Sequence, residues 1–151
     1  MSIEDRLKEM NITLPKAAAP AANYVPFVKS GDYLYVSGQI PMGASGLEYI
    51  GKLGENTSVE DGQAAAKLYA LNILAQAKSA LGELENIKQL VKLVGFVNSA
   101  PDFVDQPKVI NGASDFMVEV MGDKGRHARS AIGVAALPFG VAVEIEAIFE
   151  I

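Results

Sequence analysis

The stretch VAVEIEAIFEI, residues 141–151, decides the fold class, because apolar side chains occupy every second position from Val141 to Ile151. The intervening positions carry three glutamates. Alternation with a period of two is typical of a strand with one buried face and one open face. We therefore predict a long C-terminal strand whose open face carries Glu144, Glu146 and Glu150.

Two helices are predicted upstream of this strand. Ser58 is a good N-cap with Asp61 at the third helical position, and Gly82 is a natural C-terminal stop. A second helix follows Pro107 and ends at Gly122. Apolar residues recur at helical spacing in both, at Ala64, Leu68, Leu71 and Ala75 in the first and at Ile110, Ala113, Met117 and Val120 in the second.

The remaining segments complete an α+β domain. A short N-terminal helix is expected after Ser2, and the proline-containing segment 14–22 is expected to lie across the fold as a strap. Because strands and helices alternate in the order ββαβαββ, we predict one domain over 1–151, a mixed sheet with the two main helices on one face. The other strands are expected at 25–28, 33–37, 87–98 and 130–135, and a long loop at 41–57 with a short strand near Tyr49 and Ile50.

Small residues line one side of the predicted strand 130–135. Ala131, Gly133 and Ala135 leave room for a close approach on that side. Since the two helices are expected to cover the other face of the sheet, we expect another subunit, or a cavity, against these residues.

Composition excludes several classes of function. The 151 residues include no cysteine and one histidine, which removes disulfide scaffolds, thiol nucleophiles and zinc sites built from cysteine or several histidines. A net charge of -5 and a pI of about 4.9 argue against a protein built to bind nucleic acid. No secretory signal or long apolar run is present. We therefore expect a cytoplasmic protein without membrane or nucleic-acid partners.

Few motifs carry chemistry. The fingerprints of P-loop and dinucleotide sites are absent. Arg126 and Arg129 stand at the entry of the strand 130–135, where a guanidinium can hold a small carboxylate through two parallel hydrogen bonds. The competing interpretation is a surface charge that balances Asp123 or Glu119.

Two other constellations are considered. Glu144 and Glu146 point the same way with roots about 7 Å apart, which suits the acid–base pair of a glycoside hydrolase. The chain lacks tryptophan and has few aromatic residues to form a sugar platform. His127 is the only histidine for a Ser–His–Asp triad, and no signature serine turn stands near it. The alternative for His127 is a loop residue with a solvated ring.

Three motifs recur together in one known family. They are Val36-Ser37-Gly38-Gln39-Ile40-Pro41, Ala128-Arg129-Ser130 followed by Val134-Ala135-Ala136-Leu137-Pro138, and Val143-Glu144-Ile145-Glu146-Ala147-Ile148. In sequence, order and spacing they resemble the RidA/YjgF family of enamine/imine deaminases, also called the endoribonuclease L-PSP family. The resemblance covers about residues 20–151, and residues 1–20 are an N-terminal extension, as in a longer-chain branch.

The resemblance implies a chorismate-mutase-like fold assembled as a homotrimer, with a central β-barrel and sites between subunits. It also implies hydrolysis of small 2-imino acids, such as the imine of 2-aminoacrylate, to 2-keto acids and ammonia, with no metal or cofactor. Arg129 would bind the substrate carboxylate, and Glu144 would position or activate the attacking water. Positions matching the family's pocket are Phe27, Ser37, Gly38, Asn111 and Ala131.

The chain departs from the family pattern at three positions. Ala131 replaces a common cysteine, Ala136 replaces an arginine, and the pocket tyrosine falls at Phe27 or at Tyr24. A non-catalytic trimer that binds small carboxylates such as 2-keto acids is the alternative function, since Arg129 would serve it equally well. Endoribonuclease activity is a further one, against which the acidic pI counts.

Overall fold

The computed structural model describes residues 1–19, 23–39, 42–43 and 45–151. Three 3₁₀ turns, η1 (Leu84–Asn86), η2 (Gly122–Gly125) and η3 (Pro138–Gly140), join the main elements. The helices and strands are α1 (Ile3–Glu9), β1 (Phe27–Ser30), β2 (Tyr33–Gln39), β3 (Met42–Gly43), β4 (Gly46–Leu47), α2 (Val59–Leu81), β5 (Gln89–Asn98), α3 (Gln106–Met121), β6 (Ala128–Val134) and β7 (Val143–Glu150).

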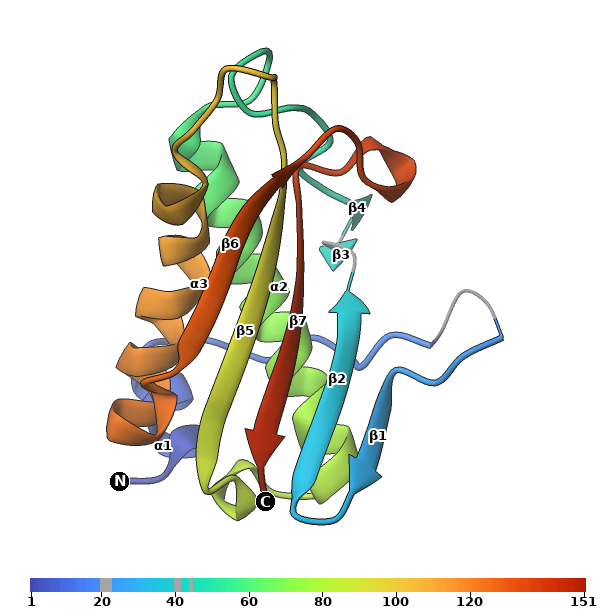
Figure 1. Cartoon of the computed structure of the whole chain (residues 1–151). Helices are drawn as coiled ribbons and strands as arrows, with labels where there is room; N and C mark the ends of the chain where they lie inside the picture. Colours follow the sequence, from blue (N-terminus) through green and yellow to red (C-terminus); the bar gives the residue numbers. More distant parts are fainter. Residues whose placement is uncertain (20–22, 40–41, 44) are drawn as a thin grey trace.

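The predicted mixed sheet is confirmed. Its strand order is β1-β2-β7-β5-β6, and every neighbouring pair is antiparallel except β5 and β6. Helices α2 and α3 pack side by side on one face of this sheet, and its other face is open (Figure 1). The α+β architecture with two main helices on one face follows the sequence expectation.

The alternation in the C-terminal stretch decides which side of β7 is buried. Every second residue of β7 from Val143 to Phe149 is buried toward the helices, while Glu144 is half-buried and Glu146 exposed on the open face. The apolar stripe of α3 is also confirmed, because Ile110, Ala113, Met117 and Val120 are fully buried. This stripe packs the helix onto β5 and β6.

Helix α2 has the predicted ends and a different buried face. The Ser58 hydroxyl accepts a hydrogen bond from Asp61 N at 3.1 Å, and Gly82 ends the helix with a φ of 83°. The stripe expected from spacing is wrong as a core face: Ala64, Leu68 and Leu71 are only half-buried. The core face is offset by about one residue and includes Ala65, Ala66, Tyr69, Ala70, Ile73, Leu74 and Ala77.

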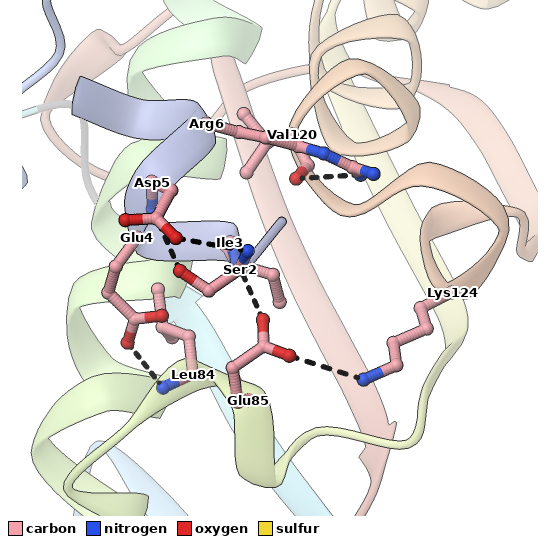
Figure 2. Close-up of polar contacts among 9 residues, drawn as sticks. All are labelled: Ser2, Ile3, Glu4, Asp5, Arg6, Leu84, Glu85, Val120 and Lys124. Atoms are coloured by element: carbon pink, nitrogen blue, oxygen red, sulfur yellow. Dashed lines mark hydrogen bonds and ion pairs between the residues drawn. The ribbon is translucent and has the colours of Figure 1, made fainter. Parts of the chain in front are cut away.

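Helix α1 begins with the predicted cap. The Ser2 hydroxyl accepts from Asp5 N at 3.0 Å, and Ser2 N donates back to the Asp5 carboxylate at 3.3 Å (Figure 2). These hydrogen bonds from the side chain and backbone of Ser2 lower the pKa of Asp5. The reciprocal pair satisfies backbone donors that the helix itself cannot satisfy.

Carboxylates of α1 and η1 attach the N-terminal helix to the body of the protein. Glu85 Oε1 accepts from Ile3 N at 2.6 Å, and Glu4 Oε1 accepts from Leu84 N at 2.7 Å (Figure 2). Arg6 donates to the Val120 carbonyl on α3 at 3.4 Å. The N-terminal extension is thus part of the packed domain.

The expected strap covers the outer side of α2. The Gln76 amide donates to the Ala18 carbonyl at 2.8 Å, and Gln76 itself is buried. The same amide donates to Gln39 Oε1 at 3.3 Å, and the Gln39 amide donates to the Ser37 carbonyl at 2.9 Å. Residues 20–22 of the expected strap lie outside the described residues.

Several expected boundaries are wrong by a few residues. The first strand spans Phe27–Ser30 instead of 25–28, and β6 starts at Ala128, so Arg129 lies inside a strand rather than at its entry. In the segment 41–57 two short strands form, β3 and β4, while Ile50 makes only an isolated bridge to Val141. Residues 40, 41 and 44, which include Ile40-Pro41 of the first family motif, lie outside the described residues.

The small residues of β6 lie on the helix side of the sheet and not on the face expected to meet a second subunit. The expected cavity is present beside two of them, since Gly133 and Ala135 line one of about 420 Å³. A side chain at Gly133 would come within 2.6 Å of Gln106 Nε2 and 3.1 Å of Ser99 Oγ, both of the same chain. The absence of a side chain at Gly133 therefore allows the N-terminal end of α3 to pack against β6. Ala135 lies beyond the end of the strand.

Within the described residues, no helix combines the length and the apolarity that crossing a bilayer requires.

Candidate functional site

Arg129 is held by one face of α3. Its Nη1 donates to Asn111 Oδ1 at 2.8 Å and to Ser114 Oγ at 3.1 Å, and its Nη2 donates to the Pro107 carbonyl at 3.3 Å. Positions 107, 111 and 114 are spaced by four and three residues, so they fall on one stripe of the helix. This stripe fixes the guanidinium.

The guanidinium keeps capacity for a ligand. An arginine has five N–H donors, and three are engaged by α3. Within the described residues, Nε–H and one Nη2 hydrogen of Arg129 have no acceptor, and no carboxylate forms an ion pair with it. Asp123 pairs instead with the exposed Arg126 at 3.4 Å. The surface-charge interpretation therefore fits Arg126, whereas Arg129 has no carboxylate partner within the described residues.

His127 joins this group, which the sequence analysis missed. Its Nδ1 lies 2.6 Å from the Gly125 carbonyl and its Nε2 lies 2.9 Å from Ser114 Oγ. A carbonyl can only accept, so the network assigns the hydrogen to Nδ1 and makes Nε2 of the neutral ring an acceptor for the Ser114 hydroxyl. His127 lies in the loop before β6, as expected, but its ring is half-buried and bonded at both nitrogens, so the expectation of a solvated ring is wrong.

A shallow cleft of about 250 Å³ lies over these residues. We call it the Arg129 cleft. Its size suits a molecule of a few heavy atoms. It is lined by Asn111, Ser114, Val118, Arg126, His127 and Arg129.

Glu144 lies on the open face of the sheet, against Gly38. A side chain at Gly38 would come within 3.0 Å of Glu144 Cδ, so this glycine makes room for the carboxylate. The pairing of β2 with β7 is irregular at this place, between Val36 and Gln39. Burial raises the pKa of Glu144, and repulsion by Glu146 adds to the effect.

Phe27 and Ser37 line a cavity of about 280 Å³ beside Glu146, on the β1–β2 side of the sheet. The Ser37 hydroxyl donates to the carbonyls of Val25 and Pro26, at 3.1 and 2.9 Å. It therefore holds the chain that enters β1. In this arrangement Ser37 shapes the cavity wall rather than offering a nucleophile.

Arg129 and Glu144 lie on opposite faces of the sheet. In the strand register, Arg129 stands beside Leu93, whose side chain is buried toward the helices, and Glu144 stands opposite Phe96. Positions 93 and 96 of one regular strand point to opposite sides. In one copy of the chain, Asn111 and Ala131 thus lie on the same side of the sheet as Arg129. Gly38 lies beside Glu144 on the other side, so the sheet separates the Arg129 group from the Glu144 group.

Among the described residues no three histidine or carboxylate side chains are grouped so that they could hold a metal ion.

The comparisons with known proteins agree with this architecture. The family described as "YjgF/chorismate_mutase-like, putative endoribonuclease" matches residues 4–148. Protein TCP17 of Trypanosoma cruzi is 51% identical over 146 residues, which cover 96% of this chain and 91% of TCP17.

Two solved structures are similar over nearly the whole chain. Protein Atu1372 of Agrobacterium tumefaciens, described as having unknown function, is 54% identical with a TM-score of 0.92, over 99% of this chain and 92% of that one. A protein of Shewanella oneidensis described as "a putative endoribonuclease" is 36% identical with a TM-score of 0.97, over 100% of both chains. The fold, the motifs and these matches together lead to one conclusion: the chain belongs to the RidA/YjgF family.

Proposed function

We propose that this protein hydrolyses small 2-imino acids, such as the imine of 2-aminoacrylate, to 2-keto acids and ammonia. The observation that carries the proposal is the state of Arg129. Three of its hydrogens are held by α3 and two have no acceptor within the described residues. A fixed guanidinium with two available donors suits a small carboxylate, which every 2-imino acid contains.

Hydrolysis of an imine requires that a water molecule be oriented beside the imine carbon and that a base accept a proton from it. The imine carbon is electrophilic, so a water placed beside it can add, and the C–N bond then breaks with its electrons leaving on ammonia. Glu144 would take a proton from that water as it adds and return it to the nitrogen, which then leaves as ammonia. A carboxyl whose pKa is raised by burial is a better base near neutral pH than an exposed one.

The active assembly would be a homotrimer. Because Arg129 and Glu144 lie on opposite faces of one chain, a site that uses both needs a second copy to supply one of them. The open face offers a surface for such contacts, since Val28, Tyr35 and Ile132 are 45–49% exposed there. A trimer with its open faces turned inward would form the central barrel and leave the helices outside. We propose the cytoplasm as its location.

The test generates 2-aminoacrylate with a serine dehydratase and follows the appearance of keto acid with and without the protein. We expect acceleration by the wild type and its loss, by at least about 100-fold, in R129A, the scale of losing a charge-assisted anchor and its orientation. R126A is the matched control, because Arg126 lies in the same cleft but pairs with Asp123; it should retain most of the activity.

Other outcomes would assign the protein differently. Arg129-dependent binding of a 2-keto acid without acceleration would indicate the non-catalytic carboxylate-binding trimer. Cleavage of RNA that is lost at high salt, with no effect on imines, would indicate the endoribonuclease. No activity and no carboxylate binding would overturn the proposal.

A further inference from the structure

A continuous series of hydrogen bonds runs from the backbone to the candidate anchor. The Gly125 carbonyl accepts from His127, His127 accepts from the Ser114 hydroxyl, and Ser114 Oγ accepts from Arg129 Nη1. The distances are 2.6, 2.9 and 3.1 Å. Every member lies in or beside the Arg129 cleft.

We propose that Ser114 is a further substrate-contacting residue of the Arg129 cleft and that His127 is its positioning residue. The inference rests on the proposed function, because it assumes that a carboxylate binds at Arg129. Ser114 Oγ lies 3.1 Å from the guanidinium, so a carboxylate on that guanidinium comes within reach of the hydroxyl.

The imidazole decides where the Ser114 hydroxyl donates. With a neutral ring, Nε2 is an acceptor and takes the hydroxyl hydrogen. With a protonated ring, Nε2 carries a hydrogen of its own and donates to Ser114 Oγ, whose two lone pairs then accept from His127 and Arg129. The hydrogen of the Ser114 hydroxyl can then no longer point at His127 Nε2, and it points into the Arg129 cleft. Ser114 then becomes a third donor for a bound carboxylate.

Charge acts in the same direction as this rotation. A protonated His127 adds a positive charge beside the cleft, which favours an anion there. By linkage, a bound carboxylate favours protonation of the ring. Both effects predict that small carboxylates bind more tightly as the pH falls.

Apart from the two arginines of the cleft, the ionisable groups around His127 are paired, exposed or on the other face of the sheet. Within its own segment, Asp123 pairs with Arg126, and Lys124 pairs with Glu85 of η1 at 3.8 Å. On α3, Asp115 and Glu119 are exposed, and on β5 Lys92 is exposed on the open face, the far side of the sheet. The cations that line the cleft with His127 are Arg126 and Arg129.

The test uses the fact that His127 is the only histidine of the chain. Calorimetry measures the dissociation constant of 2-ketobutyrate, which stays ionised throughout, at about pH 5.5 and pH 8. We expect at least about fivefold tighter binding by the wild type at the lower pH, the lower end of typical coupling between two binding events. H127Q, which keeps a polar group near Ser114 but lacks the imidazole, should bind equally at both pH values.

Further variants separate contact from structure. S114A should lose the pH dependence and raise KM in the imine assay with little change in kcat, whereas S114T, which keeps the hydroxyl, should retain both. R126Q is the control: it should weaken binding by a similar factor at both pH values and leave their ratio unchanged. A residue with a merely structural role would lower kcat and stability and leave the pH ratio intact.

These results test the roles of Ser114 and His127 separately from the proposed imine hydrolysis. pH-independent binding in the wild type, or pH dependence that survives in H127Q, overturns the role of His127 while imine hydrolysis stands. Binding and KM unchanged in a folded S114A protein overturn the role of Ser114. Absence of 2-ketobutyrate binding overturns this inference, and only the imine assay decides the proposed function.

Discussion

At the scale of single residues, neighbours decide what a charge can do. Arg126 and Arg129 are three positions apart, yet Arg126 forms an exposed ion pair with Asp123, whereas Arg129 is fixed by uncharged groups of α3. Uncharged acceptors orient a guanidinium without cancelling its charge. Under the proposed function, Asn111 and Ser114 are therefore the residues that fit Arg129 to bind an anion.

Glu144 gives a prediction about pH. Its folded-state pKa is raised by burial and by Glu146, so the stability that it contributes is complete at acidic pH, below its unfolded-state pKa. That stability is lost as the pH rises through the folded-state pKa. We expect E144Q to melt at a higher temperature than the wild type near pH 7.5 and at the same temperature near pH 3.

Calorimetric melting of both proteins at each pH checks this expectation. E119Q, which removes an exposed carboxylate on α3, is the control and should follow the wild type throughout. An E144Q protein that is less stable than the wild type at neutral pH would mean that the ionised carboxylate is held by favourable contacts.

At the scale of elements, the two main helices touch at a glycine. A side chain at Gly112 of α3 would collide with the carbonyl of Gln63 on α2. A backbone carbonyl cannot turn aside as a flexible side chain can, so G112A must push the helices apart. We expect G112A to lower the free energy of unfolding by about 1–3 kcal/mol, the usual cost of overpacking.

Urea unfolding followed by circular dichroism measures this cost. E119A, on the same helix and exposed, should stay within about 0.5 kcal/mol of the wild type. If G112A is as stable as E119A, the helices are not in contact at this point.

The strap provides a second prediction at this scale. Gln76 donates to Ala18 and Gln39, and Q76L would leave both acceptors without this partner. We expect a loss of about 1–2 kcal/mol and faster cleavage by trypsin after the exposed Lys16. Q63L is the matched control, because the Gln63 side chain on the same helix makes one exposed hydrogen bond within the described part of the chain, to the Lys108 carbonyl. Equal cleavage rates in Q76L and Q63L would contradict the role of Gln76.

The buried face of a helix or strand could be predicted from the sequence where only one of its faces is buried. β7 and α3 each bury one stripe, so their periodicity predicts their orientation. α2 is covered on its outer side by the strap, and its core face is built largely of alanine. Its buried positions include Gln76, a polar residue for which spacing of apolar residues gives no signal.

The candidate site was predicted as a set of residues and not as an arrangement. Arg129 and Glu144 come from β6 and β7, which are separated by β5, so their faces depend on two pairing registers that the sequence does not specify. The contact between Ser114 and His127 joins residues 13 positions apart across the turn η2. The stripe of Pro107, Asn111 and Ser114 was the signal that could have placed Ser114 beside Asn111.

At the scale of the whole molecule, the sheet has one face covered by helices and one exposed. Val28, Tyr35 and Ile132 on the open face are exposed large apolar residues from three different strands. Exposed apolar residues that share one face of a sheet favour burial against another copy of the chain.

The assembly is tested by a charge on this face. We expect Y35E to elute as a monomer in size-exclusion chromatography with light scattering, whereas the wild type elutes as a trimer, because a buried unpaired carboxylate is costly. V104E, at a 77% exposed loop position before α3, is the control and should remain trimeric. A trimeric Y35E protein would show that the subunits meet elsewhere.

The hydrogen bonds of Gln76 link the N-terminal segment to the strand that faces Glu144. They connect Ala18 to Gln39, and Gln39 holds the carbonyl of Ser37, the neighbour of Gly38. The N-terminal segment and the strand beside Glu144 are therefore structurally coupled through Gln76 and Gln39. A chimera that exchanges residues 1–19 between relatives must exchange the partners at 39 and 76 as well, and recombination near residue 20 would disrupt a protein whose two parts are each intact.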